Sequence, residues 1–256
     1  MRQDVRFGQI LQRLNESGSV GVAELAGQLG VSEASVRRDL RRLEQQNLLT
    51  RTHGGAAASG VLYELPMRYR GGQHHEAKRA IAAAAVALVT SETTSVGLNG
   101  GTTTTEVARA LTGHPGLRVV TNALNIASEL AVRSTIELVV CGGSARPESY
   151  ELVGPLAEQT LAHLNLDVAF IGVDGISVAA GLTTHHEVEA QTNRALAAIA
   201  DRVVVVADSS KLTKRGFARI SDLSVASDLI TDTGAPAYAV DALRQAGLDV
   251  HLVEPR

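Results

Sequence analysis

Four arginines lie within six residues of one another, at Arg37, Arg38, Arg41 and Arg42. Guanidinium groups donate hydrogen bonds in a rigid fork that fits phosphate oxygens and the acceptor edge of guanine. At about 100° per residue, a helix places three of these cations opposite an apolar seam and Arg37 on the flank. The seam consists of Val36, Leu40 and Leu43. A charge run is more often a solvated face, but this density beside an apolar seam favours binding to duplex DNA.

Small residues precede the arginines and a predicted hairpin follows them. Ser32, Ala34 and Ser35 leave room for the helix backbone to approach base edges. Residues 48–56 contain two short extended runs around polar residues and glycines, which predicts a wing. Arg51 is expected to reach the DNA backbone or minor groove from this wing. His53 has two interpretations that stay open, a contact to DNA or a steric cap of the wing.

A second group of polar residues follows predicted strands later in the chain. Residues 99–104, Asn-Gly-Gly-Thr-Thr-Thr, join a strand to a helix, where glycines and free N–H groups suit an anion. The alternative is a tight turn capped by threonine. Asp208 offers a carboxylate to sugar hydroxyls, and Lys211 offers an ammonium to a phosphate. The effector-binding residues expected at these strand ends are Asn99, Gly100, Gly101, Thr102, Thr103, Thr104, Thr121, Asn122, Gly142, Gly143, Asp174, Asp208 and Lys211.

The elements that must position the arginines form an N-terminal α+β domain, residues 1–57. Apolar residues recur with helical spacing from Phe7 to Leu14, and Gly18 ends this first helix. A second short helix ends at Gly30, which suits a left-handed residue. Ser32 is a good N-cap for the arginine helix. Three helices and a hairpin predict a winged helix-turn-helix, followed by a linker of small residues at 58–75.

Residues 76–256 alternate between strands and helices, which predicts an α/β domain with a mainly parallel sheet flanked by helices. The expected strands are 94–99, 118–122, 136–141, 167–173, 202–207 and 228–231. The expected helices are 76–90, 103–112, 124–132, 155–163, 187–200 and 236–246. Apolar runs such as 203–206 indicate a sheet covered on both faces. Ligands of such sheets bind at the carboxyl ends of the strands.

Charge and amino-acid composition argue against several classes of function. Residues 1–57 carry eight arginines and six acidic residues, a net charge of +2, whereas the remainder carries a net charge of −5. Aromatic residues make up 3% of the chain, which argues against a stacking platform for single-stranded bases. No apolar run approaches the roughly 20 residues that cross a bilayer, and no secretory pattern begins the chain. A single cysteine, Cys141, suits a reducing compartment, so we expect a cytoplasmic protein without a membrane partner.

Residues 30–40, 43–44 and 51–56 resemble the DeoR family of bacterial regulators, in which the arginine helix enters the DNA major groove. The resemblance extends from about residue 5 to 232. Its further segments are 76–82, 101–104, 119–122, 152–155, 167–172, 181–183, 189–190 and 208–211. It implies a sensor fold akin to ribose-5-phosphate isomerase, glucosamine-6-phosphate deaminase and CoA transferases. It also implies phosphorylated sugars as effectors, Glu189 in the effector site, and a homodimer or homotetramer.

Two positions depart from the family pattern. Asn99 stands where an aspartate is common, and Asn193-Arg194 stands where Lys-Arg is usual. Each change removes one charge from the presumed effector site. The glycine-threonine loop and Lys211 remain, so the phosphate hypothesis is kept.

The leading functional hypothesis is a sequence-specific regulator, a repressor of a carbohydrate-metabolism operon. It would bind double-stranded operator DNA with an affinity controlled by a phosphorylated sugar or related metabolite. The rival is a sugar-phosphate isomerase or deaminase, with Asp208 or Glu189 as general base and Lys211 on the phosphate. A third hypothesis, a non-specific chromosome-coating protein, fits poorly with the acidic larger domain.

No cofactor or metal site is expected. The adjacent pairs His74-His75 and His185-His186 lack the i, i+4 spacing of a zinc-binding helix. The second pair is instead expected to line the effector pocket.

Overall fold

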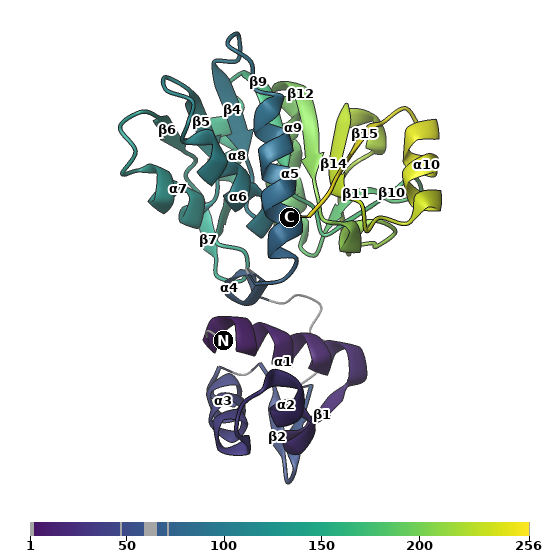
Figure 1. The fold of residues 1–256 in the computed structure, drawn as a ribbon. Helices are drawn as coiled ribbons and strands as arrows, with labels where there is room; N and C mark the ends of the chain where they lie inside the picture. Colours follow the sequence, from purple (N-terminus) through teal and green to yellow (C-terminus); the bar gives the residue numbers. More distant parts are fainter. Residues whose placement is uncertain (1–2, 47, 59–65, 71, 256) are drawn as a thin grey trace. The chain divides into compact units, whose positions relative to one another are not determined.

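The computed structural model describes residues 3–46, 48–58, 66–70 and 72–255. The chain divides into two compact units, Met1–Gln73 and His74–Arg256, and Figure 1 labels most of their elements. The expected fold class is confirmed: a winged helix-turn-helix precedes an α/β unit built on a parallel sheet. Part of the expected linker, residues 59–65 and 71, lies outside the described residues. The domain limits 1–57, 58–75 and 76–256 stay predictions.

The first unit contains the three expected helices and the wing. Its elements are α1 (Gln3–Ser17), β1 (Ser19–Gly21), α2 (Val22–Leu29), α3 (Glu33–Gln45), β2 (Thr50–Thr52), β3 (Gly55–Ala57) and α4 (Met67–Arg70). β1 was not predicted from the sequence; it pairs antiparallel with β3 and completes a three-stranded sheet in the order β1-β3-β2. Gly55 permits this pairing, because a Cβ there would lie 1.9 Å from the Val20 carbonyl oxygen. α4 was not predicted either; it lies within the range expected as linker and contributes the buried Tyr69 to the core of this unit.

The turn between α2 and α3 has the predicted chemistry. Gly30 adopts φ 63°, a left-handed conformation that favours glycine. The Ser32 hydroxyl accepts a hydrogen bond from the Ser35 N–H at 3.2 Å and caps α3. Together these two residues fix where α3 begins, and therefore where its arginines lie.

The second unit contains a seven-stranded parallel sheet in the order β15-β14-β12-β9-β4-β5-β6. Its strands are β4 (Ser95–Leu98), β5 (Arg118–Thr121), β6 (Glu137–Val140), β9 (Leu166–Ile171), β12 (Ala200–Val206), β14 (Asp228–Asp232) and β15 (Asp249–Val253). Its helices are α5 (His75–Ala87), α6 (Thr102–Leu111), α7 (Leu124–Leu130), α8 (Pro155–Leu161), α9 (Glu187–Ala198) and α10 (Ala237–Gln245). All six expected strands and all six expected helices of this unit are present.

The parallel strand β15 was not predicted. Five short antiparallel strands were not predicted either: β7 (Ser144–Arg146), β8 (Glu151–Val153), β10 (Gly175–Ser177), β11 (Gly181–Thr184) and β13 (Ala218–Ser221). β7 and β8 form a hairpin, and the other three form a sheet in the order β10-β11-β13. Two 3₁₀ turns, η1 (Ser209–Lys211) and η2 (Leu223–Val225), follow β12 and β13.

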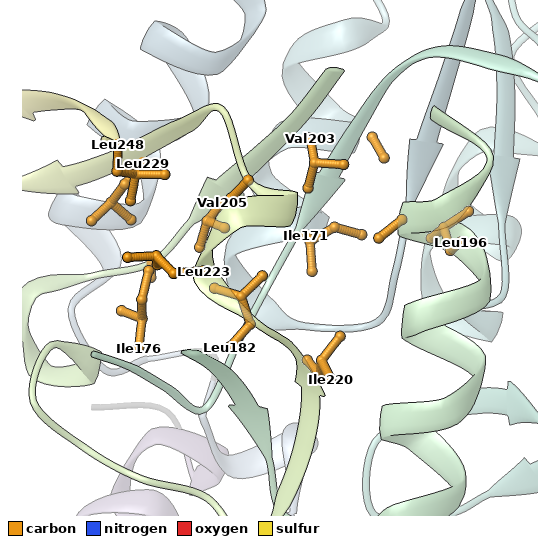
Figure 2. Close-up of a cluster of buried hydrophobic side chains, with 14 of the residues drawn as sticks. Ile171, Ile176, Leu182, Leu196, Val203, Val205, Ile220, Leu223, Leu229 and Leu248 are labelled. Carbon is orange, nitrogen blue, oxygen red and sulfur yellow. The ribbon is translucent and has the colours of Figure 1, made fainter. Parts of the chain in front are cut away.

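The parallel sheet is buried on both faces, as its apolar strands indicated. Along β12, Val203 and Val205 join one hydrophobic cluster while Val204 and Val206 join the other. Figure 2 shows the first cluster, where side chains of β9 and β12 meet those of β10, β11, β13 and α9. The second cluster packs α5, α6 and α7 against the opposite face. Of the helices in the part of the chain that the structure describes, none is long and apolar enough to span a membrane.

Candidate DNA-binding surface and effector site

The arginine face of α3 is exposed, as its pattern predicts, while the apolar seam is buried in the core of the first unit. Arg37 donates to Glu33 at 2.7 Å, and Arg42 donates to Gln3 at 2.7 Å. Arg38 and Arg41 have no hydrogen bond or ion pair with any described residue. Their guanidinium groups therefore keep all their donors available for a ligand.

Asp39 lies within the arginine run, but its carboxylate points into the first unit. Its side chain is 1% exposed. Arg6 of α1 donates to it from Nε and from Nη2, the latter at 3.0 Å to Oδ1, and Gln3 donates at 3.2 Å. This hydrogen bonding raises the pKa of Arg6. The pair joins α1 to α3 and prevents Asp39 from neutralising the exposed arginine face.

The remaining predicted DNA-binding residues flank this face. Ala34 is exposed and Ser35 is partly exposed in the first turn of α3. On the wing, the Arg51 backbone N–H donates to Glu44 at 3.1 Å, and its guanidinium lies 3.7 Å from the same carboxylate. His53 is exposed in the turn between β2 and β3. Glu44 thus ties the wing to the last turn of α3.

In the second unit, the strand order reverses between β4 and β9, since the chain continues to β5 and β6 on one side and to β12, β14 and β15 on the other. Ligands of open parallel sheets bind at the carboxyl ends of strands beside such a point. Asn99 follows β4 and bonds to Gly172, which follows β9. Its Nδ2 donates to the Gly172 oxygen at 3.0 Å, and its Oδ1 accepts from the Gly172 N–H at 2.8 Å. An aspartate has no donor when ionised, so it could not make both bonds.

The glycine-threonine loop leads directly into α6. Gly101 adopts φ 155°, and its carbonyl accepts hydrogen bonds from the hydroxyls of Thr104 and Thr105. The first N–H groups of an α-helix have no acceptor within the helix, and no side chain of the described residues caps α6. Thr102 is partly exposed, whereas Thr103 and Thr104 are buried. The N–H groups at the start of α6 are therefore suitable donors for an anion.

Of the polar residues predicted after β5, Thr121 and Asn122 have different roles. The Thr121 hydroxyl donates to the last carbonyl of β4 at 2.7 Å and accepts from the Ala123 N–H at 3.1 Å, so it ties the two strands together. The Asn122 Nδ2 donates to the Leu152 carbonyl at 3.2 Å. Its Oδ1 is buried and has no partner among the described residues.

Two glycines predicted for the site lie between β6 and β7. Gly142 is exposed. Gly143 adopts φ 134°, and a Cβ there would lie 2.8 Å from the Val153 carbonyl oxygen. Gly143 therefore allows β7 to approach β8.

Charged side chains meet at the ends of β9, β11 and α9. Lys211 Nζ lies 3.4 Å from Asp174 Oδ1. The Thr184 hydroxyl lies within hydrogen-bond distance of Asp174 at 3.0 Å and of Glu189 at 3.2 Å. Arg146 of β7 donates to Glu189 at 2.8 Å. The structure thus brings together the predicted residues Asp174, Glu189 and Lys211.

Asp208 follows β12 and is buried beside two lysines. Burial opposes its ionisation, but a hydrogen bond from Ser210 and the charges of Lys78 and Lys211 together lower the pKa of Asp208. Lys78 belongs to α5 and is itself buried. Asp208 is therefore ionised at neutral pH.

Glu151 of β8 occupies the start of the glycine-threonine loop. Its Oε1 accepts a hydrogen bond from the Gly100 N–H at 2.7 Å. Burial raises the pKa of Glu151, and the negative charges of Glu189 and Asp174 raise it further, whereas hydrogen bonds from Gly100 and Asn193 oppose the rise. The net result is a pKa well above the usual range of a glutamate.

Comparison with protein families agrees with both units. A model of the DeoR-like helix-turn-helix domain matches residues 6–59, and a model of the DeoR C-terminal sensor domain matches residues 73–233. The chain belongs to the DeoR family. The arginine face of α3 and the strand ends around Asn99 both lie within the matched DeoR ranges.

Two DeoR-family relatives are regulators by name. The chain is 37% identical over 246 residues to the HTH-type transcriptional regulator GlpR of Haloferax volcanii, covering 96% of each protein. It is 29% identical over 252 residues to the glycerol-3-phosphate regulon repressor of Escherichia coli K12, covering 98% of this chain and 100% of the relative. Among solved structures, it is similar to ribose 5-phosphate isomerase A of Methanocaldococcus jannaschii, with a TM-score of 0.41, 22% identity and 56% of each chain covered.

Four residues that contact or lie beside the predicted site residues were not themselves predicted: Lys78, Arg146, Glu151 and Thr184. Lys78 carried a signal, since it lies on the apolar side of a predicted helix, next to Ala77. Arg146 and Glu151 belong to three-residue strands, which are too short for a periodic pattern. Only the hairpin of β7 and β8 brings them to the site.

The two histidines of the pair at 185–186 lie in different surroundings. His185 Nε2 lies 3.8 Å from Asp174 Oδ1, at the charged cluster. His186 instead caps α9, where its Nδ1 accepts from the Val188 N–H at 3.3 Å.

At the edge of the parallel sheet, three possible metal ligands lie close together: Asp228, Asp249 and His251. Arg202 donates to both oxygens of Asp228, at 2.8 and 2.7 Å, so this cluster is held by an ion pair.

Proposed function

We propose that this DeoR-family chain is a sequence-specific repressor of a carbohydrate-metabolism operon. Its operator affinity is controlled by a phosphorylated sugar or related metabolite bound in the second unit. We further propose that residues 1–57 form the DNA-binding domain, residues 58–75 the linker and residues 76–256 the effector-sensing domain. The active form is a homodimer or homotetramer, because two arginine helices related by symmetry read a repeated half-site.

The observation that carries DNA binding is the state of Arg38 and Arg41. Both are exposed on α3, and neither is neutralised by a described residue. The acidic residue between them, Asp39, is turned inward and paired with Arg6. A helix that follows a tight turn and presents unpaired guanidinium groups suits the DNA major groove.

Support for the effector comes from the strand ends of the second unit. The start of α6 offers N–H groups to a phosphate, and Lys211 and Lys78 add positive charge beside Asp208. Asp208 and Asp174 offer carboxylates to sugar hydroxyls. The relative named as a glycerol-3-phosphate regulon repressor points to the same chemical class of metabolite.

DNA binding is tested by fluorescence anisotropy with the duplex upstream of the chain's own gene and with a scrambled duplex. Arg38→Ala and Arg41→Ala are each expected to weaken binding to the specific duplex about tenfold and to reduce its salt dependence. Arg133→Ala, an exposed arginine of the second unit, serves as the matched control. Wild-type affinity for the specific duplex in both α3 variants would refute the proposal that α3 binds in the DNA major groove.

Effector control is tested by adding phosphorylated sugars to the protein–DNA complex. A coupling free energy of about 1–3 kcal/mol corresponds to a 5- to 150-fold change in operator affinity. Thr102→Ala and Lys211→Ala are expected to reduce this response while leaving DNA affinity without effector unchanged. An unaltered response in both variants would show that the effector does not bind at Thr102 and Lys211.

One observation favours the enzymatic alternative, since a buried carboxyl with a raised pKa, such as Glu151, is a common feature of active sites. Against this alternative, Glu189 is paired with Arg146, and the lowered pKa of Asp208 makes it a weak general base. We therefore expect the purified protein to bind sugar phosphates without converting them. Turnover of a sugar phosphate, followed by NMR, would establish an isomerase or deaminase.

A further inference from the structure

We propose that Glu151 determines which effector the site accepts. Its carboxyl keeps an anion away from the Gly100 end of the glycine-threonine loop, and with Asn193 it selects an effector that presents a hydrogen-bond donor there, a hydroxyl or an ammonium. This inference rests on the proposed function, because it concerns the same effector site.

The first step is the occupation of the Gly100 amide. The backbone N–H of Gly100 has a single hydrogen, and Glu151 Oε1 accepts it at 2.7 Å. The contact is close, since a Cβ on Gly100 would lie 2.3 Å from Glu151 Cγ. Glu151 is 2% exposed, so it lies within the fold. A phosphate must therefore use the later N–H groups, at Thr102 and Thr103.

The second step is an unpaired acceptor beside Glu151. Asn193 of α9 is 2% exposed and lies close enough to Glu151 to lower the pKa of its carboxyl. Its Oδ1 is buried and has no partner among the described residues, and the same holds for Oδ1 of Asn122. A buried acceptor without a donor is unfavourable, and a ligand hydroxyl or ammonium would satisfy it.

The third step is the charge around Glu151. The neighbouring carboxylates of Glu189 and Asp174 already have cationic partners, Arg146 and Lys211. A phosphate placed beside Glu151 would meet three carboxyl groups and no unpaired cation among these five residues. A ligand donor would instead meet acceptors. The geometry, the unpaired oxygen and the charges therefore favour the same kind of ligand group.

The test is isothermal titration calorimetry of the full-length protein with three probes: inorganic phosphate, glucose 6-phosphate and glucosamine 6-phosphate. Glu151→Ala is expected to bind inorganic phosphate about tenfold more tightly than the wild type, since it frees one N–H for a charge-assisted bond. Glu137→Ala, which removes an exposed glutamate of β6, is the control and should match the wild type.

The two sugar phosphates distinguish the donors. A wild-type preference for glucosamine 6-phosphate that disappears in Glu151→Ala identifies an ammonium, whereas equal affinities that both fall in Asn193→Ala identify a hydroxyl. Inorganic phosphate that binds Glu151→Ala no more tightly than the wild type, or that binds neither protein, overturns the proposal.

Should Glu151→Ala fail to fold, Glu151→Ser decides the question. The shorter serine side chain leaves the Gly100 N–H free, so this variant should bind inorganic phosphate about tenfold more tightly than the wild type. Binding no tighter than in the wild type would again overturn the proposal.

Operator affinity is measured in parallel with each probe. Probes that bind with the predicted pattern but leave operator affinity unchanged refute the proposed function and not the role of Glu151. Operator release that is identical in the wild type and Glu151→Ala refutes the role of Glu151 and not the proposed function.

Discussion

Replacing Arg6 with glutamine is expected to destabilise the first unit by about 3 kcal/mol. The variant leaves Asp39 buried, with Gln3 as its remaining side-chain partner among the described residues. Removing one partner of a buried ion pair costs about 3–5 kcal/mol, because the other charge stays out of water. The lower limit applies here, since the Arg6 side chain is 13% exposed and water can partly replace it.

Native-state hydrogen exchange, resolved by mass spectrometry, measures this change in each unit separately. A chain of two units does not guarantee a single unfolding transition, so exchange is preferable to a global melting curve. A loss of about 3 kcal/mol corresponds to roughly 100-fold faster exchange, which should appear in peptides of α1 and α3. Peptides of His74–Arg256 should be unchanged and serve as the internal reference.

Arg37→Gln is the matched control, because it removes the same type of side chain from an exposed pair in the same unit. Arg37 is 57% exposed, and an exposed i, i+4 pair contributes about 0.5 kcal/mol or less. Adding Asp39→Asn to Arg6→Gln should restore most of the protection, since no buried charge remains unpaired. Equal exchange rates in Arg6→Gln and Arg37→Gln would refute the reasoning.

Three further predictions concern the second unit. The folded-state pKa of Glu151 lies above its unfolded value of about 4.3, so the native state holds a proton that the unfolded state has lost between these two values, and the free energy of unfolding falls there as pH rises, by up to about 1.4 kcal/mol per pH unit. Glu151→Gln should remove this decline in urea titrations from pH 5 to 8. Identical pH profiles of the variant and the wild type would contradict the prediction. Burial raises the pKa of Cys141 to about 11, so a disulfide reagent at pH 8 should label it only after unfolding, and rapid labelling of the native protein would show an accessible thiolate. Gly100→Ala should displace Glu151 and destabilise the unit by about 1–3 kcal/mol, and calorimetry that shows an unchanged Tm would mean that the loop adapts without strain.

Apolar periodicity was sufficient to predict the main elements of both units. The run Val203–Val206 is buried on both sides of the sheet, and such runs are distinctive in sequence. Three- and four-residue strands such as β7, β8 and β11 are too short to show a period, and β11 also pairs with β13, which lies much later in the chain. Their absence from the predictions explains why Arg146 and Glu151 were not anticipated.

The exposed arginine surface was predictable because it depends on the periodicity of one helix. The burial of Asp39, which lies between these arginines in sequence, was not predictable. Asp39 is buried only because Arg6, 33 positions earlier, supplies its counter-charge. The contact between Glu151 and Gly100 spans 51 positions, and that between Asn99 and Gly172 spans 73. Contacts of this kind depend on tertiary packing, and no local pattern encodes them.

The position of β9 beside β4 has a consequence for synthesis of the chain. The side-chain hydrogen bonds in the first unit join described residues no more than 61 positions apart, so this unit can fold early, as N-terminal domains do on the ribosome. The central pair of the parallel sheet must wait until residue 171 has left the ribosome. A message cut short between residues 73 and 99 would therefore yield a fragment that displays Arg38 and Arg41 but lacks the loop at Asn99, through which the proposed effector would control DNA binding.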